Sequence, residues 1–500
     1  DYVAARGIID DAEHFDAQFF GMPPKLAEIT DPQQRVLLEL AWSALEDSGV
    51  IPSQTSDRIG VWAGAYSTTQ VTKNILSNRE LLRETGEFNA GIYNEKDYIA
   101  TRIAHALNLN GPAINVNTAC STSLVAVIEA CKSLQAGDCD VALAGGVSVH
   151  FPQHSGHVHQ QGSIFSPDGH CRPFDANGAG TLFCDGAGLV VLKRLEDALS
   201  DNDRIYAVVK GYGINNDGGD KASFSAPSIS GQAEAIAMAQ AMAEVHPETI
   251  TYIEAHGTAT PVGDPIEVAA LQTVFEAQTD AKQFCAIGSV KSNIGHTVAA
   301  AGAAGLIKVA LSMHHEKIPS TLHFQSPNPQ IDFEQSPFFV CDSLTDWKRG
   351  DQPRRAGVSS FGVGGTNAHL VIEEAPKNDE VTDGKQGNQT PLCILPISGK
   401  TEAALDENVA RLVKSLRDDD VELVSAASTL QFGREAFAHR AAIVSATLDE
   451  SIDSLESRKA PVFVSRKASS HSRDLVFMFP GQGAQYVRMG QNLYEHSSVF

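Results

Sequence analysis

Short apolar runs alternate with longer, polar-faced stretches along the first three quarters of the chain. Apolar residues follow one another almost without interruption in these runs, which is typical of strands covered on both faces of a sheet. The runs predict strands at Ile59–Ala65, Ala113–Asn117, Asp140–Val149, Leu189–Leu192, Tyr206–Val209, Thr251–Ala255 and Phe284–Ser289.

In the stretches between these runs, apolar residues recur at helical spacing. This spacing predicts helices at Ser121–Gln135, Gly231–Ala243, Pro265–Gln278 and Ala299–His314. Strands that alternate with crossover helices predict an α/β sheet protein.

An earlier helix has its own start and stop signals. Asp31 is expected at its N-cap, Pro32 in the first turn and Gln34 as the closing residue of a capping box, while Gly49 ends it. Its apolar stripe consists of Val36, Leu37, Leu40, Ala41, Ala44 and Leu45.

A polar, unpatterned stretch at Lys377–Gln389 predicts a loop that precedes a second, smaller α/β unit. That unit is expected to contain strand Leu392–Ile397, helices Thr401–Arg417 and Val421–Gln431, and strand Ala441–Val444. A basic, Ser-rich stretch at Ser465–Arg473 then precedes a predicted strand, Leu475–Phe479. Both ends of the sequence interrupt a pattern, so we expect it to be part of a longer chain.

Composition narrows the class of protein. With 500 residues, 42% hydrophobic and 20% charged, the chain has the balance of a globular protein of two or three domains. The net charge of −23 argues against binding bulk nucleic acid. No apolar stretch is long enough for a membrane span, and the start does not resemble a signal peptide. The eight cysteines form no CxxC pair, so neither a zinc site nor a disulfide framework is indicated, and a reducing cytoplasm fits best.

Cys120 is the strongest candidate for chemistry. It lies in Val-Asn-Thr-Ala-Cys-Ser-Thr-Ser, where an apolar run turns into a helix pattern. A thiol in the first turn of a helix is favoured as the thiolate, its nucleophilic form. A cysteine in an apolar run is more often a packed core residue, as we expect for Cys131. The polar residues that crowd the turn around Cys120 favour catalysis on acyl groups.

Two histidines follow strand-like runs in Gly-rich turns. His256 lies in Glu-Ala-His-Gly-Thr-Ala-Thr, and His296 ends Lys-Ser-Asn-Ile-Gly-His, which begins at Lys291. Strand ends of this kind collect ligand-binding groups in α/β sheets. Two roles of Lys291 fit the sequence equally well. It either stabilises negative charge at the site or forms a salt bridge that fixes the turn. Thr258 and Thr260 are either turn-forming residues or ligand contacts.

Three further features are interpreted as structural rather than catalytic. The turn Phe361–Asn367 lacks the spacing of a phosphate-binding loop and is expected to be a mobile turn that exposes backbone N–H groups. Asp264 is expected to cap the following helix. The histidines within His154–His159 lack the spacing of metal ligands and predict a surface loop.

Taken together, these segments resemble the ketosynthase domain of type I modular polyketide synthases, relatives of the fatty-acid synthase condensing enzymes. The resemblance rests on Thr118-Ala-Cys-Ser-Thr-Ser-Leu, on the two histidine motifs, on the closing Gly357-Val-Ser-Ser-Phe-Gly-Val-Gly-Gly-Thr-Asn-Ala-His and on the early Asp31-Pro-Gln-Gln-Arg. Four ordered motifs make it specific.

The resemblance implies a thiolase fold, in which two similar α/β halves form a layered α-β-α-β-α sandwich, normally a homodimer. The halves would span residues 1–200 and 201–374, and a ketosynthase-to-acyltransferase linker would span residues 375–472. Residues 473–500 would open an acyltransferase domain with Gln482 at its oxyanion hole. The serine motif of that domain is absent from the sequence, so no acyltransferase activity is expected.

The resemblance also implies the mechanism. Cys120 would accept an acyl group from the phosphopantetheine of an acyl carrier protein, and a malonyl-type extender would decarboxylate and attack it. His256 and His296 would assist decarboxylation and stabilise the enolate, with electrostatic support from Lys291. The backbone N–H groups of Cys120 and Phe361 would form the oxyanion hole. Thr258 and Thr260 would contact the pantetheine arm. No cofactor or metal is bound by the domain itself.

The sequence departs from the family in several places. The family's opening strand is missing, which predicts a less stable first half. Asn117, Thr122 and Ala259 stand where Asp, Ser and Gly are common, which bears on substrate preference more than on chemistry.

The alternatives are a fatty-acid-type condensing enzyme, including a polyunsaturated fatty-acid synthase, and a non-elongating transfer or docking domain. A decarboxylating loading domain, which carries Gln in place of the nucleophilic cysteine, is excluded by Cys120. A Cys-His hydrolase would need an orienting Asn or Asp and has no use for two histidine motifs. A structural scaffold explains none of the four motifs.

Overall fold

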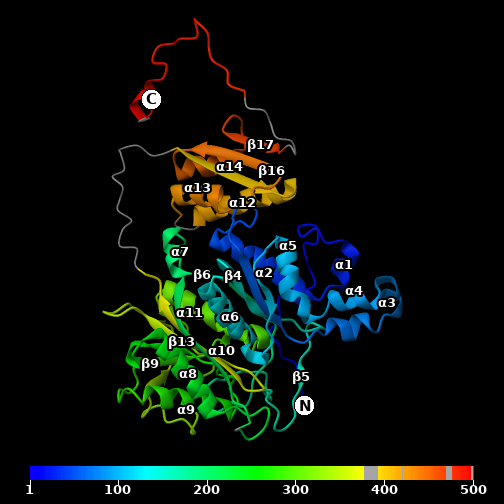
Figure 1. The fold of residues 1–500 in the computed structure, drawn as a ribbon, viewed down its shortest axis with the longest axis vertical. Coiled ribbons are helices and arrows are strands. Elements are labelled where there is room, and N and C mark those ends of the chain that lie inside the picture. Colours follow the sequence, from blue (N-terminus) through cyan, green and yellow to red (C-terminus); the bar gives the residue numbers. More distant parts are fainter. Residues whose placement is uncertain (220, 377–391, 419–420, 469–475, 497–498, 500) are drawn as a thin grey trace. The chain divides into compact units, whose positions relative to one another are not determined.

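A computed structural model describes residues 1–219, 221–376, 392–418, 421–468, 476–496 and 499 (Figure 1). The chain divides into two compact units. The first comprises residues 1–389 and 428–435, and the second comprises residues 390–427 and 436–500. The loop predicted at Lys377–Gln389 lies outside the described residues.

Two sheets organise the first unit. The smaller has the order β3-β2-β4-β6, formed by Ala113–Asn115, Ile59–Ala65, Val141–Ser148 and Gly186–Lys193. The larger has the order β11-β9-β8-β13-β14-β7, formed by Phe338–Val340, Cys285–Gly288, Tyr252–Glu254, Arg355–Phe361, Thr366–Glu374 and Ala207–Asn216. Each sheet has a parallel part followed by antiparallel edge strands. This repeated arrangement is the duplication expected of a thiolase-like fold.

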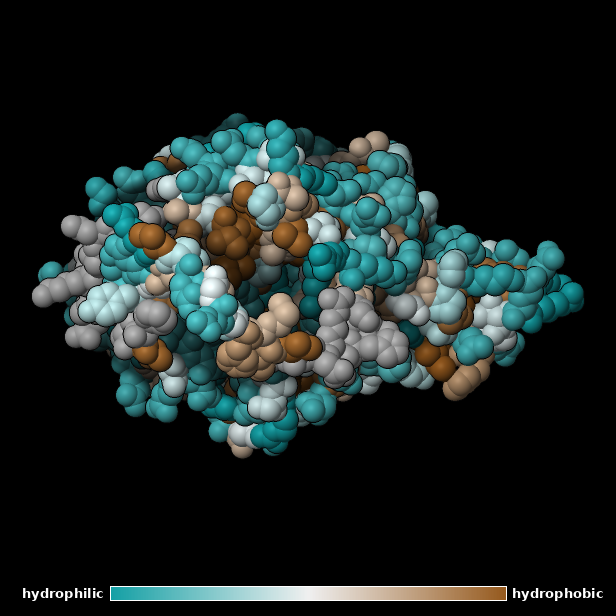
Figure 2. Space-filling view, turned by 90° about the horizontal axis from the view of Figure 1, so that it is seen from above, coloured by the Kyte–Doolittle hydropathy of each residue, from teal (hydrophilic) through white to brown (hydrophobic). Residues whose placement is uncertain are grey.

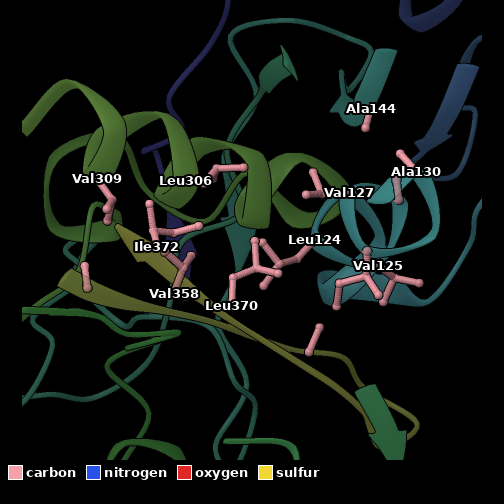
Figure 3. Close-up of a cluster of buried hydrophobic side chains, with 14 of the residues drawn as sticks. Leu124, Val125, Val127, Ala130, Ala144, Leu306, Val309, Val358, Leu370 and Ile372 are labelled. Carbon is pink, nitrogen blue, oxygen red and sulfur yellow. The ribbon is translucent and has the colours of Figure 1, made fainter. Parts of the chain in front are cut away.

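Helices α6 (Thr122–Ala136) and α11 (Ala301–His314) form the middle layer, since each contacts strands of both sheets. The smaller sheet is covered on its other face by α2 (Pro32–Ser48) and α5 (Ile99–Leu107), and the larger by α8 (Ile229–Ala243) and α9 (Gly263–Phe275). The layers therefore follow one another as α-β-α-β-α. Figure 3 shows side chains of α6, α11, β13 and β14 gathered in the central hydrophobic cluster between the sheets.

Shorter elements connect these layers. The remaining helices of the first unit are α1 (Pro24–Ile29), α3 (Arg79–Thr85), α4 (Glu87–Ile92), α7 (Leu195–Ser200) and α10 (Lys291–Ile294). Two small antiparallel pairs join β1 (Tyr2–Val3) to β5 (His157–Val158) and β10 (Lys317–Ile318) to β12 (Thr345–Asp346).

The first-unit strands and helices predicted from the sequence are present, with ends that differ by a few residues. The largest difference is β7, which runs on to Asn216 because β14 pairs with it along its whole length. The start of α2 is only partly as predicted. The Asp31 side chain accepts a hydrogen bond from the N–H of Gln33, but the Asp31 N–H donates to Tyr93 O at 2.8 Å. Gln34 donates to Glu95 O at 3.1 Å, so the capping box is wrong.

The second unit contains a three-stranded antiparallel sheet in the order β15-β16-β17, formed by Cys393–Gly399, His439–Ser445 and Phe463–Lys467. Helices α12 (Glu402–Asp418) and α14 (Leu448–Ser457) pack against it. Helix α13 (Leu423–Phe432) follows α12, and its residues from 428 onward belong to the first unit. The predicted strand Leu475–Phe479 is wrong for its described residues. Residues 476–479 are extended but pair with no described strand, and their side chains are exposed. A short helix, α15 (Gln491–His496), lies near the end.

The crossing of α6 and α11 leaves no room for a side chain at Gly302. A Cβ atom there would lie 2.6 Å from the Cβ of Leu124 and 2.8 Å from its backbone N. We expect Gly302→Ala to lower the free energy of unfolding by about 1–3 kcal/mol, because backbone must shift to relieve the overlap. Gly350→Ala is the matched control, since nothing lies within 4 Å of its Cβ position. Thermal unfolding midpoints that fall equally in both variants would contradict this packing.

Candidate active site

Cys120 lies in a tight turn between β3 and α6. Residues Ala119–Ser121 form a single 3₁₀ turn directly before α6, and the residue before the cysteine has φ 55°, an uncommon value for a residue with a side chain. The N–H of Thr118 donates to Thr122 Oγ1 at 2.9 Å, and Ser360 Oγ donates to the carbonyl of Cys120 at 2.9 Å. The cysteine is 5% exposed and is held from both sides.

The two predicted histidines converge on this thiol. The Sγ of Cys120 and a ring nitrogen of each of His256 and His296 lie within 4.8 Å of one another. The two imidazoles meet edge to face, with centroids 5.4 Å apart. His256 follows the carboxyl end of β8, and His296 follows α10, which itself comes after β9. Residues from three parallel strand ends of two sheets thus share one site, as in other α/β proteins.

The turn that carries His256 is fixed by a buried carboxylate that the sequence analysis missed. The N–H groups of His256 and Gly257 donate to the two oxygens of Glu267 at 2.6 and 2.8 Å. Burial raises the pKa of Glu267 to about 7, and these two hydrogen bonds act in the opposite direction. The signal in the sequence is an acidic residue on a helix whose neighbours are apolar, at Pro265-Ile-Glu-Val-Ala-Ala.

His296 has a defined tautomer. The N–H of Val298 donates to Nδ1 of His296 at 3.3 Å, so the neutral ring carries its proton on Nε2. Burial lowers the pKa of His296 well below its usual value, and nearby Lys291 lowers it further. Burial has the same effect on the pKa of His256, whose Nδ1 has no hydrogen-bond partner among the described residues. Both rings are therefore neutral near pH 7, and His296 can donate Nε2–H.

Lys291 supplies positive charge to the buried site. It is 3% exposed, and burial lowers the pKa of Lys291 while Glu254 and Glu267 raise it. Among the described residues no salt bridge of Lys291 is present, and the nearby Glu254 carboxylate pairs with Lys308 at 2.8 Å and accepts from Tyr252 Oη at 2.7 Å. Electrostatic support of the site by Lys291 stays a prediction.

The pKa of the Cys120 thiol differs from the one expected for a thiol at the start of a helix. Burial raises the pKa of Cys120, while the N–H of Val363 and the charge of Lys291 lower it by less. The prediction that this position favours the thiolate is wrong for the free site, because nearly complete removal from water outweighs the hydrogen bonds and nearby charge.

These shifts predict the pH dependence of acylation. Below the raised pKa of Cys120 the thiolate fraction increases about tenfold per pH unit, so the rate of acyl transfer to the enzyme is expected to rise steadily from pH 6 to pH 9. Neither His256 nor His296 adds a step in that range, since the pKa of each lies below it. Single-turnover acylation followed by intact mass would test this. A rate that is flat over the range would indicate a preformed thiolate.

The Gly-rich turn after β13 approaches the cysteine loop closely. A Cβ at Gly362 would lie 2.3 Å from the carbonyl oxygen of Thr118, so only glycine fits there. The ring of Phe361 packs 5.8 Å from that of His256. The backbone N–H of Val363, in the same turn, reaches the Cys120 thiol.

Thr258 and Thr260 lie together in the loop between β8 and α9. Both are half-buried, and their hydroxyl oxygens are 3.2 Å apart. Asp264 does not cap α9 as predicted, because the helix begins at Gly263 and the carboxylate points back into this loop. It accepts hydrogen bonds from the N–H groups of Ala259 at 3.0 Å and Phe174 at 2.8 Å.

The other candidates lie apart from this arrangement. Cys131 lies on α6, and burial raises its pKa to about 12, which fits the predicted core role. His157, in the short strand β5, and His159, just after it, bond to the carbonyls of Ser166 and Phe165, so the surface loop predicted for His154–His159 is wrong at His157. Gln482 is exposed in a turn of the second unit.

The surface gives few further signals. The face in Figure 2 is largely hydrophilic, with hydrophobic residues in separate patches. Among the described residues, no helix combines the length and the apolar character required to cross a membrane.

Comparison with protein-family models gives three consecutive matches. Residues 1–198 match "Beta-ketoacyl synthase, N-terminal domain", residues 206–325 match "Beta-ketoacyl synthase, C-terminal domain", and residues 327–444 match "Ketoacyl-synthetase C-terminal extension".

Curated and solved relatives agree with these matches. The chain is 44% identical over its whole length to one component of the phenolphthiocerol/phthiocerol polyketide synthase of Mycobacterium tuberculosis, of which it covers 35%. It is 40% identical to polyketide synthase PksN of Bacillus subtilis, with 90% of this chain and 8% of PksN covered. It is also similar to ketosynthase twelve of the bacillaene polyketide synthase of Bacillus amyloliquefaciens, with a TM-score of 0.86 and 38% identity, covering 93% of this chain and 81% of that one.

Proposed function

The chain belongs to the beta-ketoacyl synthase family, as a ketosynthase of the polyketide synthase type with a thiolase-like fold, and we propose that it catalyses decarboxylative condensation of acyl thioesters. The observation that carries the proposal is the buried convergence of one thiol and two neutral imidazoles within 4.8 Å. The curated relatives are polyketide synthases, which favours this pathway over a fatty-acid synthase. A non-elongating domain would not need all three groups.

In the first half-reaction, the Cys120 thiolate attacks the thioester carbonyl of an acyl group carried on phosphopantetheine. The oxyanion forms between the backbone N–H groups of Cys120 and Phe361. The C–S bond to the carrier breaks, the pantetheine thiolate leaves and takes up a proton, and the acyl group remains on Cys120. Thr258 and Thr260 are placed by their shared loop to contact the pantetheine arm.

In the second half-reaction, a malonyl-type thioester loses CO₂, and the electron pair of the broken C–C bond passes into an enolate. The Nε2–H of His296 donates to the enolate oxygen together with His256, and the Lys291 charge adds electrostatic support. The α-carbon then attacks the acyl-Cys120 carbonyl and displaces the thiolate. The product is a β-ketoacyl thioester two carbons longer in its main chain. No step draws on a metal or bound cofactor.

The proposal is tested by following both half-reactions by intact mass. The enzyme is mixed with a short acyl thioester, desalted and then given malonyl carrier protein. We expect one acyl adduct that peptide mapping assigns to Cys120, followed by its loss and the appearance of a β-ketoacyl carrier protein. Adduct formation without any extension would favour the transfer or docking alternative.

The same resemblance assigns the rest of the chain. Residues 1–374 form the ketosynthase, with halves at 1–200 and 201–374, residues 375–472 form the linker to an acyltransferase, and residues 473–500 begin that acyltransferase with Gln482 at its oxyanion hole. The match to the mycobacterial synthase along the whole of this chain supports this order. Acyl carrier protein and further domains of a multidomain synthase are the expected partners, in the cytoplasm.

A homodimer is also part of the proposal. Strand β3 is a three-residue edge strand whose Ile114 is 49% exposed, and an edge of this kind offers unpaired backbone groups to a second sheet. Light scattering on the purified protein would test the stoichiometry.

A further inference from the structure

Tyr66 lies beside the nucleophile and has no role in the mechanism above. It directly follows β2, which runs parallel to β3 with Ala63 opposite Asn115. Three residues beyond this pair come Tyr66 on one strand and Thr118 on the other, two positions before Cys120. Tyr66 and Cys120 therefore follow the carboxyl ends of two neighbouring parallel strands, β2 and β3.

The backbone at Tyr66 is fixed on both sides. Its N–H donates to Val147 O at 3.0 Å, and its carbonyl accepts from Gln33 Nε2 at 3.2 Å. Gln33 in turn accepts the N–H of Val149 at 3.3 Å, which ties this position to the end of β4. A side chain on this support has little freedom to leave the site.

The ring of Tyr66 is held between two others. It packs 4.7 Å from His150 and 6.3 Å from Phe183, and Phe183 lies 5.3 Å from the imidazole of His296. One phenyl ring thus separates Tyr66 from the catalytic histidine. These contacts restrict the position of the Tyr66 ring.

His150 is itself locked by a buried carboxylate. Asp185 Oδ1 accepts hydrogen bonds from the backbone N–H of His150 at 2.9 Å and from its Nδ1 at 2.8 Å. The other oxygen accepts from Gln153 Nε2 at 2.7 Å. Asp185 is 7% exposed, so this network is part of the rigid interior that supports the Tyr66 ring.

The hydroxyl of Tyr66 is left without a partner. Its hydrogen bonds to described residues are the two backbone bonds given above, and neither involves Oη. The residue is half-buried, and burial raises the pKa of Tyr66, with the nearby Cys120 adding to the rise and Arg6 opposing it. The hydroxyl itself is reached by solvent, so water or a substrate atom can serve as its partner. A free phenol beside the thiol is therefore placed for a substrate atom.

We propose that the Tyr66 hydroxyl binds an oxygen substituent of the acyl chain carried by Cys120, so that the enzyme prefers hydroxyacyl or ketoacyl thioesters to saturated ones. The phenol can donate to a keto oxygen and can both donate to and accept from a hydroxyl. A saturated chain at the same place would cover the phenol and leave its hydrogen bond unmade, which selects against that chain. The pantetheine arm enters from the other half, at Thr258 and Thr260.

The inference rests on the proposed acyl-enzyme, and acylation rates test both. We would compare hexanoyl, 3-hydroxyhexanoyl and 5-hydroxyhexanoyl N-acetylcysteamine thioesters, which have the same chain length, in the wild type and in Tyr66→Phe. At least one hydroxyacyl ester is expected to acylate the wild type roughly tenfold faster than hexanoyl, and Tyr66→Phe is expected to abolish that preference by slowing the hydroxyacyl ester alone.

Tyr206→Phe is the matched control, because it removes a phenol bonded to Asp47 at 3.2 Å. It should leave every ratio unchanged. The contact is overturned if Tyr66→Phe keeps the wild-type ratios, or if it slows all three esters equally at an unchanged melting temperature. Absence of any adduct on the folded wild type would overturn the acyl-enzyme itself, and the contact with it.

Discussion

Cys120→Ala is expected to abolish the acyl adduct and to slow condensation by at least about a thousandfold. The reason is that the acyl chain must stay covalently bound to the enzyme between the two half-reactions. Among the described residues, the site contains one thiol within 4.8 Å of the two imidazoles. Intact mass after exposure to an acyl thioester measures the first effect. Product formation with malonyl carrier protein measures the second.

Cys131→Ala is the control for the loss of a thiol. Cys131 lies on the helix that begins just after Cys120, and burial without any opposing contact raises its pKa to about 12. This variant should keep the single adduct and the wild-type rate. An adduct that persists in Cys120→Ala would show that another residue accepts the acyl group, and the proposed mechanism would fail.

The layered fold could be predicted because its strands carry continuous apolar residues. Ile59–Ala65 and Asp140–Val149 read as strands covered on both faces, and β2 and β4 are indeed buried between helices along their whole length. Strand β17 was missed because its residues are mostly exposed and its apolar part, Phe463-Val464, is short and gives way to Ser-Arg-Lys. The predicted strand ending at Phe479 failed for the opposite reason, since apolar residues without a described partner strand do not form a sheet.

The residues proposed to be catalytic could be found because each lies in a turn rich in small residues. The sequence could not show which of several neighbouring residues directs its N–H group or side chain toward the site, because this depends on backbone geometry. The N–H that reaches the thiol belongs to Val363, a contact that the sequence pattern does not indicate. Asp264 similarly looks like a helix cap, yet its carboxylate holds the loop of Ala259. Such roles depend on directions in space that spacing does not encode.

The depth at which the site residues are buried is the other property that sequence motifs do not show. A helix start suggested a reactive thiolate at Cys120, but the depth of the site raises the pKa of the thiol. The same depth lowers the pKa of both histidines and keeps them as neutral donors. The buried site thus favours hydrogen-bond donation to an oxyanion by the two neutral histidines over proton transfer by an imidazolium. The two half-reactions can therefore use different groups of the site.

His296→Ala is expected to split the two half-reactions: acylation of Cys120 should change by less than about threefold, while condensation from the preformed acyl-enzyme should fall by about 10²–10³. The Nδ1 of His296 accepts the N–H of Val298, so its Nε2–H is the donor available to the enolate. In the proposed mechanism, acylation instead uses the backbone donors at Cys120 and Phe361, which this variant leaves in place.

Single-turnover intact mass on the preloaded enzyme, with and without malonyl carrier protein, measures the two rates for His296→Ala separately. His296→Asn restores an N–H donor and should recover part of the lost condensation rate, whereas His170→Ala, in an exposed loop, should behave as the wild type. If His296→Ala slows acylation as much as condensation, the imidazole acts on the thiol rather than on the enolate. The neutral-donor role assigned to it from the Val298 hydrogen bond would then be wrong.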